Sequence, residues 1–278
     1  MKNNGNRRKT GKEQFYTLPA VSDTCVAACL GKISNFNDLS FIEPAGGTGN
    51  FVESLIKAGV SSSSIISLDI EPKHPAVILG DFFEFTQSLF GYICISNPPF
   101  GRANSLSKKF FNHAADLDAD YIAFLVPKSW RKWSVINSLN NKYFIFKDID
   151  LPRESFETDS GEAYKNTGGL QCIFQIWKRY EGHHSRDKII VPDHGLIDKV
   201  GPEDAHVALT IFGWSAGKVE TEFERVPNTT KIFLKVKDNS VITALQSLDY
   251  AKFYNNVAYI PALSLQEINH LLNEYYNI

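Results

Sequence analysis

Apolar runs with the composition of β-strands alternate with amphipathic segments over the first two thirds of the chain. Amphipathic helices are indicated at 50–59 and 104–117, and shorter helices are expected at 22–31 and 84–89. Strands that alternate with helices favour a largely parallel sheet that is covered on both faces. The seven candidate strands are 40–45, 64–71, 76–82, 92–97, 121–127, 143–151 and 172–179.

The pattern changes towards the end of this region. Segment 154–171 lies between the last two candidate strands, has no helical stripe and is rich in Gly, Ser and Thr, so these two strands are expected to form an antiparallel hairpin with a long loop. A linker follows at 181–187. The sequence therefore predicts an α/β domain over 1–182, with a seven-stranded, mostly parallel, Rossmann-like sheet, and a small α+β appendage over 188–278.

Composition is typical of a globular protein. The 278 residues are 43% apolar and 22% charged, which provides enough material for a packed core. The formal net charge of −2 gives no overall basic field, so nucleic-acid binding must come from local clusters. No stretch approaches the roughly 20 apolar residues of a membrane span, from which we expect no membrane association and a cytoplasmic location.

The four cysteines form no CxxC pair. Cys94 and Cys172 lie inside candidate strands, which predicts reduced and mostly buried thiols. Cys25 and Cys29 are spaced to share one face of a helix, but no His or further Cys lies close to them in sequence. We therefore expect no metal site.

The first candidate strand ends in EPAGGTGNF, residues 43–51. Its glycines let the backbone approach a ligand closely, and the start of the following helix offers N–H groups, which suits a nucleotide-like cofactor; a simple tight turn is the alternative. Asp69 ends the second strand, where a carboxylate can accept from ribose hydroxyls. At the end of the third strand, Asp81 is suited to accept from an exocyclic amine or to cap a helix, and Phe82 to stack on a base.

The fourth candidate strand ends at Asn97, and Pro98, Pro99 and Phe100 follow it directly. Two consecutive prolines cannot continue a paired strand because each lacks the backbone N–H, so the strand must end at Asn97. Taken alone, this is a strand-to-loop stop. Together with the three motifs before it, however, this tetrapeptide forms an ordered set that a simple strand end does not explain.

With these motifs the chain resembles the class I S-adenosylmethionine-dependent methyltransferases, in particular the amino-methyltransferases that make N6-methyladenine in DNA. The resemblance spans roughly residues 13–179 and follows the γ-type order, in which QFYTLP (14–19) precedes the glycine motif and the catalytic tetrapeptide comes later. The family more usually has Thr-Pro where Leu18 here separates Thr17 from Pro19. Gly46 stands where other small residues are common in the family, a difference that costs nothing sterically.

The resemblance implies S-adenosylmethionine as the cofactor. The segment around Thr17 would close over the methionine moiety, the glycine motif would hold the methionine end, Asp69 the ribose, and Asp81 with Phe82 the adenine. The cofactor-binding residues implied in this way are Phe15, Tyr16, Thr17, Glu43, Pro44, Gly47, Gly49, Asn50, Phe51, Asp69, Ile70, Asp81 and Phe82.

Asn97, Pro98, Pro99 and Phe100 match the catalytic motif of this family. The exocyclic amine of adenine is a poor nucleophile because its lone pair is delocalised into the ring. The side-chain carbonyl of Asn97 and the backbone carbonyl of Pro98 can accept its two hydrogens and so direct the lone pair at the methyl donor. Proline pre-orients these acceptors, and Phe100 would stack on a base that a duplex must extrude.

Basic residues follow the catalytic turn and the next strand, at the edge of the sheet where ligands bind. Cations interleaved with aromatic rings suit phosphate contact and base stacking, whereas a solvated basic loop with its tryptophans in the core is the alternative. The candidate nucleic-acid contacts are Arg102, Lys108, Lys128, Trp130, Arg131 and Lys132. A basic tail at Arg7, Arg8, Lys9 and Lys12 is a further candidate.

The sequence thus predicts an enzyme that methylates N6 of adenine in nucleic acid, with DNA preferred as the substrate. Methylation of an RNA base is the first alternative, because the same tetrapeptide occurs in ribosomal-RNA enzymes. Related motifs occur in enzymes that methylate N4 of cytosine or a protein glutamine. A methyltransferase-like fold retained as an inactive nucleic-acid-binding subunit is the remaining alternative.

Overall fold

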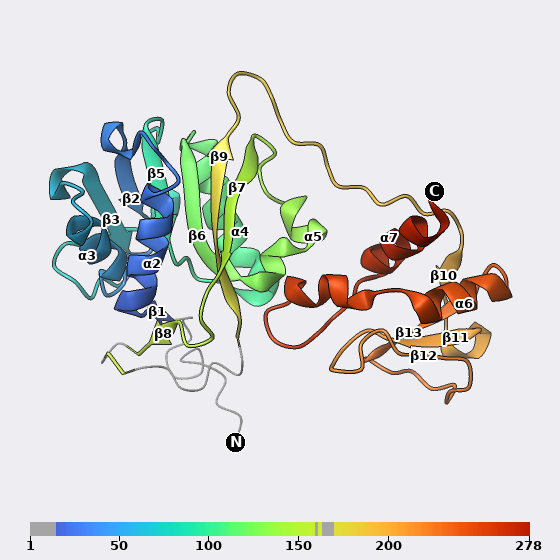
Figure 1. Cartoon of the computed structure of the whole chain (residues 1–278). Helices are drawn as coiled ribbons and strands as arrows, with labels where there is room; N and C mark the ends of the chain where they lie inside the picture. Colours follow the sequence, from blue (N-terminus) through green and yellow to red (C-terminus); the bar gives the residue numbers. More distant parts are fainter. Residues whose placement is uncertain (1–14, 159–160, 163–169) are drawn as a thin grey trace. The chain divides into compact units, whose positions relative to one another are not determined.

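The computed structural model describes residues 15–158, 161–162 and 170–278. The chain divides into two compact units, Met1–Lys188 and Ile189–Ile278 (Figure 1). The predicted basic tail with Arg7 and Arg8 lies outside the described residues.

A seven-stranded sheet forms the centre of the first unit. Strands β2 to β6 run parallel, whereas β9 is antiparallel to both of its neighbours, β6 and β7. This arrangement confirms the predicted mostly parallel sheet with its antiparallel hairpin. The strands, in their order across the sheet, are β4 (Ile78–Leu79), β3 (Ile65–Asp69), β2 (Ser40–Glu43), β5 (Tyr92–Ser96), β6 (Tyr121–Pro127), β9 (Cys172–Arg179) and β7 (Tyr143–Asp150).

The chain order reverses between the neighbouring strands β2 and β5. Strands β3 and β4 lie beyond β2, whereas β6 lies beyond β5. Ligands of open α/β sheets bind at such a reversal, outside the carboxyl ends of the strands. A ligand site is therefore expected at the loops that follow β2, β3 and β5.

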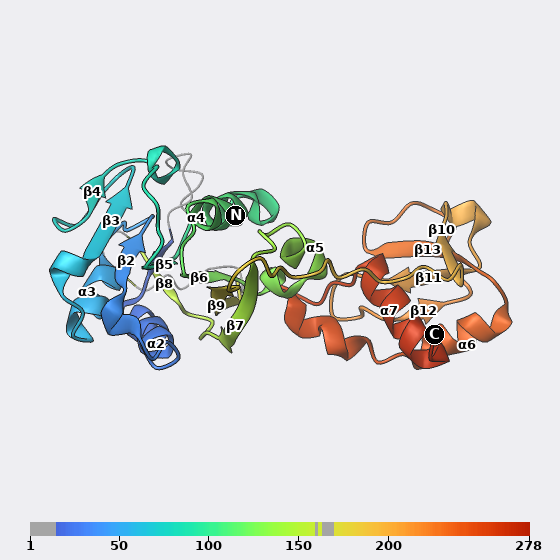
Figure 2. The ribbon, with the colours of Figure 1, turned by 90° about the horizontal axis from the view of Figure 1, so that it is seen from above.

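Helices cover both faces of this sheet. Helices α2 (Pro19–Leu30) and α3 (Asn50–Lys57) lie on one face, and α4 (Ser105–Asp116) lies on the other (Figure 2). Helix α2 begins earlier than the predicted residue 22 because Pro19, which has no N–H, suits the first helical turn. Cys25 and Cys29 point from α2 into the core, and all four cysteines are buried, which confirms the predicted buried thiols.

The predicted helix at 84–89 is wrong. Only a short 3-10 turn forms, at Phe82–Glu84, and the chain beyond it is irregular. This segment is fixed instead by contacts with the region of α4, because the ring of His113 bonds the carbonyl of Phe85 at 3.0 Å and the N–H of Leu89 bonds the carbonyl of Leu117 at 2.6 Å. The predicted strand 76–82 is likewise reduced to the two residues of β4.

Two short strands outside the main sheet were not predicted from the sequence. Strand β1 (Tyr16–Thr17) pairs antiparallel with β8 (Phe156–Glu157), which lies in the long loop between β7 and β9. A short helix, α5 (Trp133–Ile136), follows a 3-10 turn at Lys128–Arg131.

The second unit is built on a four-stranded antiparallel sheet in the order β10 (Ile197–Lys199), β13 (Lys231–Val236), β11 (Val207–Thr210) and β12 (Val219–Glu220). Helices α6 (Asn239–Ser247) and α7 (Leu265–Tyr276) complete it, and Ser264 and Glu267 form a capping box at the start of α7.

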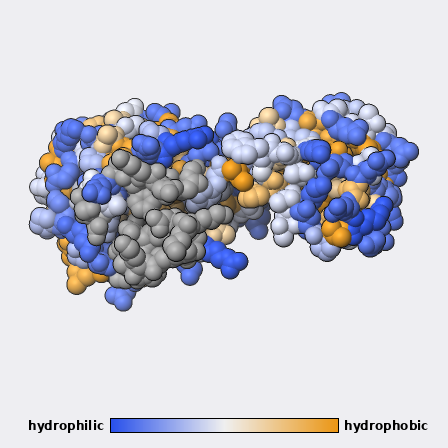
Figure 3. All heavy atoms as spheres, turned by 90° about the horizontal axis from the view of Figure 1, so that it is seen from below, coloured by the Kyte–Doolittle hydropathy of each residue, from blue (hydrophilic) through white to orange (hydrophobic). Residues whose placement is uncertain are grey.

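On the face shown in Figure 3, apolar surface is interspersed with hydrophilic surface. Among the described residues, no helix has the length and apolarity that crossing a membrane requires.

Candidate active site

A cavity of about 420 Å³ opens where β2, β3 and β5 end. All predicted catalytic residues and all predicted cofactor-binding residues except Gly49 line it. The motifs come from five separate stretches of the chain, and the parallel sheet brings them to one edge because the carboxyl ends of its strands point the same way.

The glycine loop forms the floor of this cavity and has little tolerance for side chains. Gly47 adopts φ +48, and a Cβ there would lie 2.8 Å from the ring of Tyr16. At Gly46 a Cβ would lie 2.2 Å from the Oγ of Ser67, so this position also has no room for a side chain. Gly49 is the residue before α3 and faces His74 rather than the cavity, so it shapes the turn at φ +79.

Asp69 holds the glycine loop in place. One carboxylate oxygen accepts from the N–H of Gly47 at 2.9 Å, and the other accepts from the N–H of Glu71 at 2.7 Å. Glu71 also lines the cavity and pairs with Lys73 at 2.7 Å, although the sequence did not single it out. The carboxylate of Asp69 thus presents its remaining acceptor capacity beside a glycine backbone that a ligand can approach closely.

Glu43 is a further carboxyl group at the cavity wall. It is buried at the end of β2 and accepts from the hydroxyl of Ser67 at 3.0 Å. Burial, with a smaller contribution from the charge of Asp69, raises the pKa of Glu43 to about 8. A carboxyl group that keeps its proton at neutral pH can donate a hydrogen bond as well as accept one.

Asp81 and Phe82 occupy the third strand end as predicted. One oxygen of Asp81 accepts from the N–H of Phe83 at 2.9 Å, so the capping role that was the alternative is present, and the residue also lines the cavity. The ring of Phe82 is buried and stacks on Phe110, with ring centroids 5.6 Å apart. Phe110 and Leu106 of α4 complete this wall, and both belong to the apolar stripe visible in the sequence.

The catalytic turn is held by its own side chain. The Nδ2 of Asn97 donates to the backbone carbonyl of Phe15 at 2.7 Å, which fixes the orientation of the amide. Within residues 15–158, 161–162 and 170–278, the Oδ1 of Asn97 and the carbonyl of Pro98 receive no hydrogen bond. Two acceptors on one rigid turn are therefore available at the cavity wall.

Phe100 anchors this turn to the protein core. Its ring is buried and packs against Phe15 at 6.4 Å and Phe156 at 6.3 Å between centroids. Its carbonyl accepts from the N–H groups of Leu106 and Ser107, at 3.1 and 3.3 Å. The side chain and the backbone of Phe100 thus both fix the position of the acceptors that precede it.

Thr17 carries an orphaned polar atom. The side chain is buried, it lines the cavity, and its Oγ1 has no hydrogen-bond partner in the part of the chain that the structure describes. A buried hydroxyl without a partner is costly, so Thr17 offers a hydrogen-bonding group to whatever molecule occupies the cavity.

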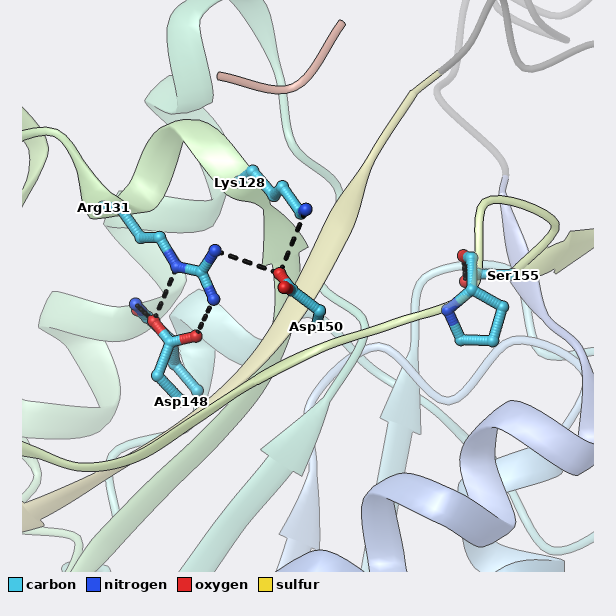
Figure 4. Close-up of polar contacts among 7 residues, drawn as sticks. Lys128, Arg131, Asp148, Asp150 and Ser155 are labelled. Atoms are coloured by element: carbon cyan, nitrogen blue, oxygen red, sulfur yellow. Dashed lines mark hydrogen bonds and ion pairs between the residues drawn. The ribbon is translucent and has the colours of Figure 1, made fainter. Parts of the chain in front are cut away.

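The predicted basic loop after β6 does not have the expected character. Trp130 is completely buried and donates to Ser107 at 3.3 Å, so the prediction that it stacks on bases is wrong. Arg131 forms a two-pronged ion pair with Asp148 and a further contact with Asp150 at 3.0 Å, and Lys128 pairs with Asp150 at 3.1 Å (Figure 4). Because two carboxylates neutralise these two cations, the predicted phosphate contacts of Lys128 and Arg131 are corrected to structural ion pairs.

Other cations remain near the site. Arg102 is exposed and directly follows Gly101, which lines the cavity, and Lys108 is half-buried on α4. Neither pairs with a carboxylate among the described residues. Lys132 is half-buried at the start of α5. Arg102, next to a residue of the cavity lining, thus remains a candidate for phosphate contact, and Lys108 lies on the helix that supplies Leu106 and Phe110 to the cavity.

Comparison with known proteins gives no family assignment. No family model matches the chain, and no curated protein matches it. Among solved structures, it is similar to a protein described as an RNA methyltransferase from Pyrococcus horikoshii, with 15% identity, 60% of this chain and 88% of the other covered, and a TM-score of 0.42.

A protein from Listeria monocytogenes described as a class I S-adenosylmethionine-dependent methyltransferase gives 16% identity over 63% of this chain and 64% of the other, with a TM-score of 0.43. A protein from Vibrio vulnificus described as a modification subunit of a type I restriction enzyme gives 13% identity over 98% of this chain and 63% of the other, with a TM-score of 0.45. In these two matches the chain covers less than two thirds of the other protein. At such TM-scores the similarities carry no argument about function.

Proposed function

We propose that this protein is an S-adenosylmethionine-dependent methyltransferase that acts on the N6 amino group of adenine in DNA. The observation that supports this most is the shared cavity, in which the glycine loop and the turn of Asn97, Pro98, Pro99 and Phe100 face the same space. A cofactor pocket and a pair of amine acceptors within one cavity are what transfer of a group to an exocyclic amine requires.

The chain's own residues fit the cofactor. The cavity volume of about 420 Å³ falls within the range of about 300–1,000 Å³ typical of small-molecule sites. The orphaned hydroxyl of Thr17 needs a partner there, and Asp69 offers acceptors for ribose hydroxyls beside the close-approach backbone of Gly47. Phe82 offers an aromatic wall for adenine. The bound cofactor would supply an electrophilic methyl group.

The catalytic turn prepares the target amine. The Oδ1 of Asn97 and the carbonyl of Pro98 accept its two hydrogens and thereby localise the nitrogen lone pair for attack. Because Phe15 fixes the amide and the prolines fix the backbone, the acceptors need no reorganisation when the base arrives. Phe100 forms part of the apolar wall against which an extruded base lies.

Nucleic acid would approach over the loop that follows the catalytic turn. Arg102 and Lys108 carry charges suited to the phosphates next to the target nucleotide. The cations of Lys128 and Arg131 are taken up by Asp148 and Asp150, so phosphate binding relies on fewer groups than the sequence indicated.

Two measurements test the proposal. Titration calorimetry with S-adenosylmethionine should give saturable one-to-one binding, which Gly47→Ala should weaken because its Cβ enters the space of Tyr16. A filter-binding assay with methyl-labelled cofactor should give label in unmethylated mixed-sequence DNA. Label in total RNA alone would transfer the proposal to the RNA alternative, and the absence of cofactor binding would refute it.

A further inference from the structure

The segment Phe15–Leu18, which we call the strap, forms one wall of the cavity. Phe15, Tyr16 and Thr17 line the cavity, and Tyr16 lies against Gly47, where a Cβ would come within 2.8 Å of its ring. The strap touches the catalytic turn as well, since the carbonyl of Phe15 accepts from the Nδ2 of Asn97 at 2.7 Å. Its position therefore affects both the predicted cofactor loop and the predicted catalytic amide.

Strand β8, which is far from the strap in sequence, holds it in place. Tyr16 and Thr17 pair with Glu157 and Phe156 in antiparallel register. The ring of Phe15 packs against Phe156 at 5.4 Å between centroids. The strap is thus paired through its backbone and packed through its first aromatic ring.

The side chain of Asn50 connects strap, β8 and helix α3. Its Nδ2 donates to the carbonyl of Thr17 at 2.6 Å and to the Oε1 of Glu157 at 2.7 Å. Glu157 is a buried carboxyl group and both bonds of Asn50 are partly buried, so water competes with them only in part. Asn50, expected to bind the cofactor, uses its donor atom for this connection.

Leu18 strengthens the connection at the point where the sequence departs from the Thr-Pro pattern. Its backbone N–H donates to the carbonyl of Ser155 at 2.9 Å. A proline directly after Thr17 has no N–H and could not make this bond. The additional residue therefore adds an anchor between the strap and the turn that leads into β8.

The chain that carries β8 is itself fixed at its start. Asp150 at the end of β7 is held by Lys128 and Arg131, and the hydroxyl of Ser155 donates to the carbonyl of Pro152 at 2.5 Å (Figure 4). Burial opposes ionisation of Asp150, but the bonds from Lys128 and Arg131 outweigh it and lower the pKa of this carboxyl. The two cations predicted to bind phosphate thus hold the support from which β8 extends.

We propose that β8 positions the catalytic amide through the strap, and that Glu157 is a positioning residue for methyl transfer. This inference rests on the proposed function. As long as the carbonyl of Phe15 stays in place, it accepts from Nδ2 of Asn97, so that Oδ1 is the atom left for the substrate amine. If the strap shifts, the amide loses this constraint and can rotate to present N–H groups, which repel the hydrogens of the amine.

Two matched pairs of variants test this positioning role. Glu157→Ala removes the acceptor of Asn50, whereas Glu157→Gln retains an acceptor oxygen of the same reach. Leu18→Pro removes the N–H that bonds Ser155 and suits the observed φ of −58°, whereas Leu18→Ala removes the side chain and keeps the N–H. In each pair the first variant should lose function and the second should not.

The first readout is the single-turnover rate of methyl transfer to DNA at saturating cofactor, measured with melting temperature as a check on folding. Glu157→Ala and Leu18→Pro should lower this rate at least tenfold, and both controls should stay within about threefold of the wild type, because the loss reflects misorientation of a preorganised acceptor. Rates of the first variants within twofold of the wild type would overturn the inference. So would equal losses in variants and controls.

The second readout does not require activity. Hydrogen exchange followed by mass spectrometry should show faster exchange of peptides covering 15–20 in Glu157→Ala and Leu18→Pro than in their controls. If the wild type transfers no methyl group but the strap responds in this way, the proposed function fails and the support of the strap by β8 stands. Unchanged exchange in both variants overturns that support as well.

Discussion

Replacing Asn97 with alanine should separate chemistry from cofactor binding. The substitution removes Oδ1, one of two acceptors for the substrate amine, and Nδ2, which bonds Phe15 at 2.7 Å. Loss of one preorganised hydrogen bond at a reacting group typically costs about 10²–10³ in kcat, or about 3–4 kcal/mol. Loss of the bond to Phe15 adds about 1 kcal/mol to the stability cost, which melting temperature would report.

The assay is single-turnover transfer of labelled methyl groups to unmethylated DNA, together with calorimetric titration of S-adenosylmethionine. Asn97→Ala should lower the rate by at least a hundredfold and leave the cofactor dissociation constant within about threefold. Asn97→Asp is the informative control, because it keeps an acceptor but loses the donor to Phe15, and it should retain more activity than alanine. A rate above a tenth of the wild type in Asn97→Ala, or a cofactor affinity that falls as far as the rate, would refute the assigned role.

Three further changes probe the remaining parts of the site. Asp69→Ala leaves the N–H groups of Gly47 and Glu71 without their acceptor, so calorimetry should show at least tenfold weaker cofactor binding and thermal melting a lower stability, whereas an unchanged dissociation constant would contradict the ribose assignment. Because Glu43 stays protonated in the folded state up to about pH 8 but ionises near pH 4.5 when unfolded, the free energy of unfolding should fall as pH rises through this window. Denaturant titrations should show that Glu43→Gln flattens this dependence by roughly 5 kcal/mol, because each pKa unit of difference between the two states corresponds to about 1.4 kcal/mol. Arg102→Ala should raise KM for DNA several-fold and reduce the slope of log DNA affinity against log salt concentration by about 1, with cofactor affinity unchanged. If neither KM nor this slope changes, Arg102 does not contact DNA.

The fold was largely accessible from the sequence because its strands are strongly patterned. The run Tyr121–Pro127 is apolar and fully buried, and Cys172–Arg179 is mostly apolar and buried over its first six residues, as strands inside a sheet require. Predicted site residues fell into one cavity for the same reason, since each motif followed a strand and parallel strands end at one edge. Leu106 and Phe110 were visible in the helical stripe, but their place at the cavity depends on how α4 packs.

Contacts between segments that lie far apart in the sequence could not be predicted from it. Nothing near Arg131 in the sequence indicates that Asp148 and Asp150 neutralise it, because that pairing depends on the antiparallel strand β7. The pairing of Tyr16 with Glu157 joins two-residue strands that have no periodicity to detect. The helix prediction for 84–89 failed because these six residues have a mixed hydrophobic pattern, so that tertiary contacts decide between helix and coil.

The most direct test of the central claim is nucleoside mass spectrometry after incubation with isotopically methyl-labelled S-adenosylmethionine, applied in parallel to unmethylated mixed-sequence DNA and to total RNA. The account predicts labelled N6-methyladenine from DNA with the wild type, and its loss with Asn97→Ala. Label on another nucleoside would contradict the adenine assignment, label confined to RNA would contradict the choice of DNA, and no label in either, with cofactor bound, would contradict the claim that this site methylates a base.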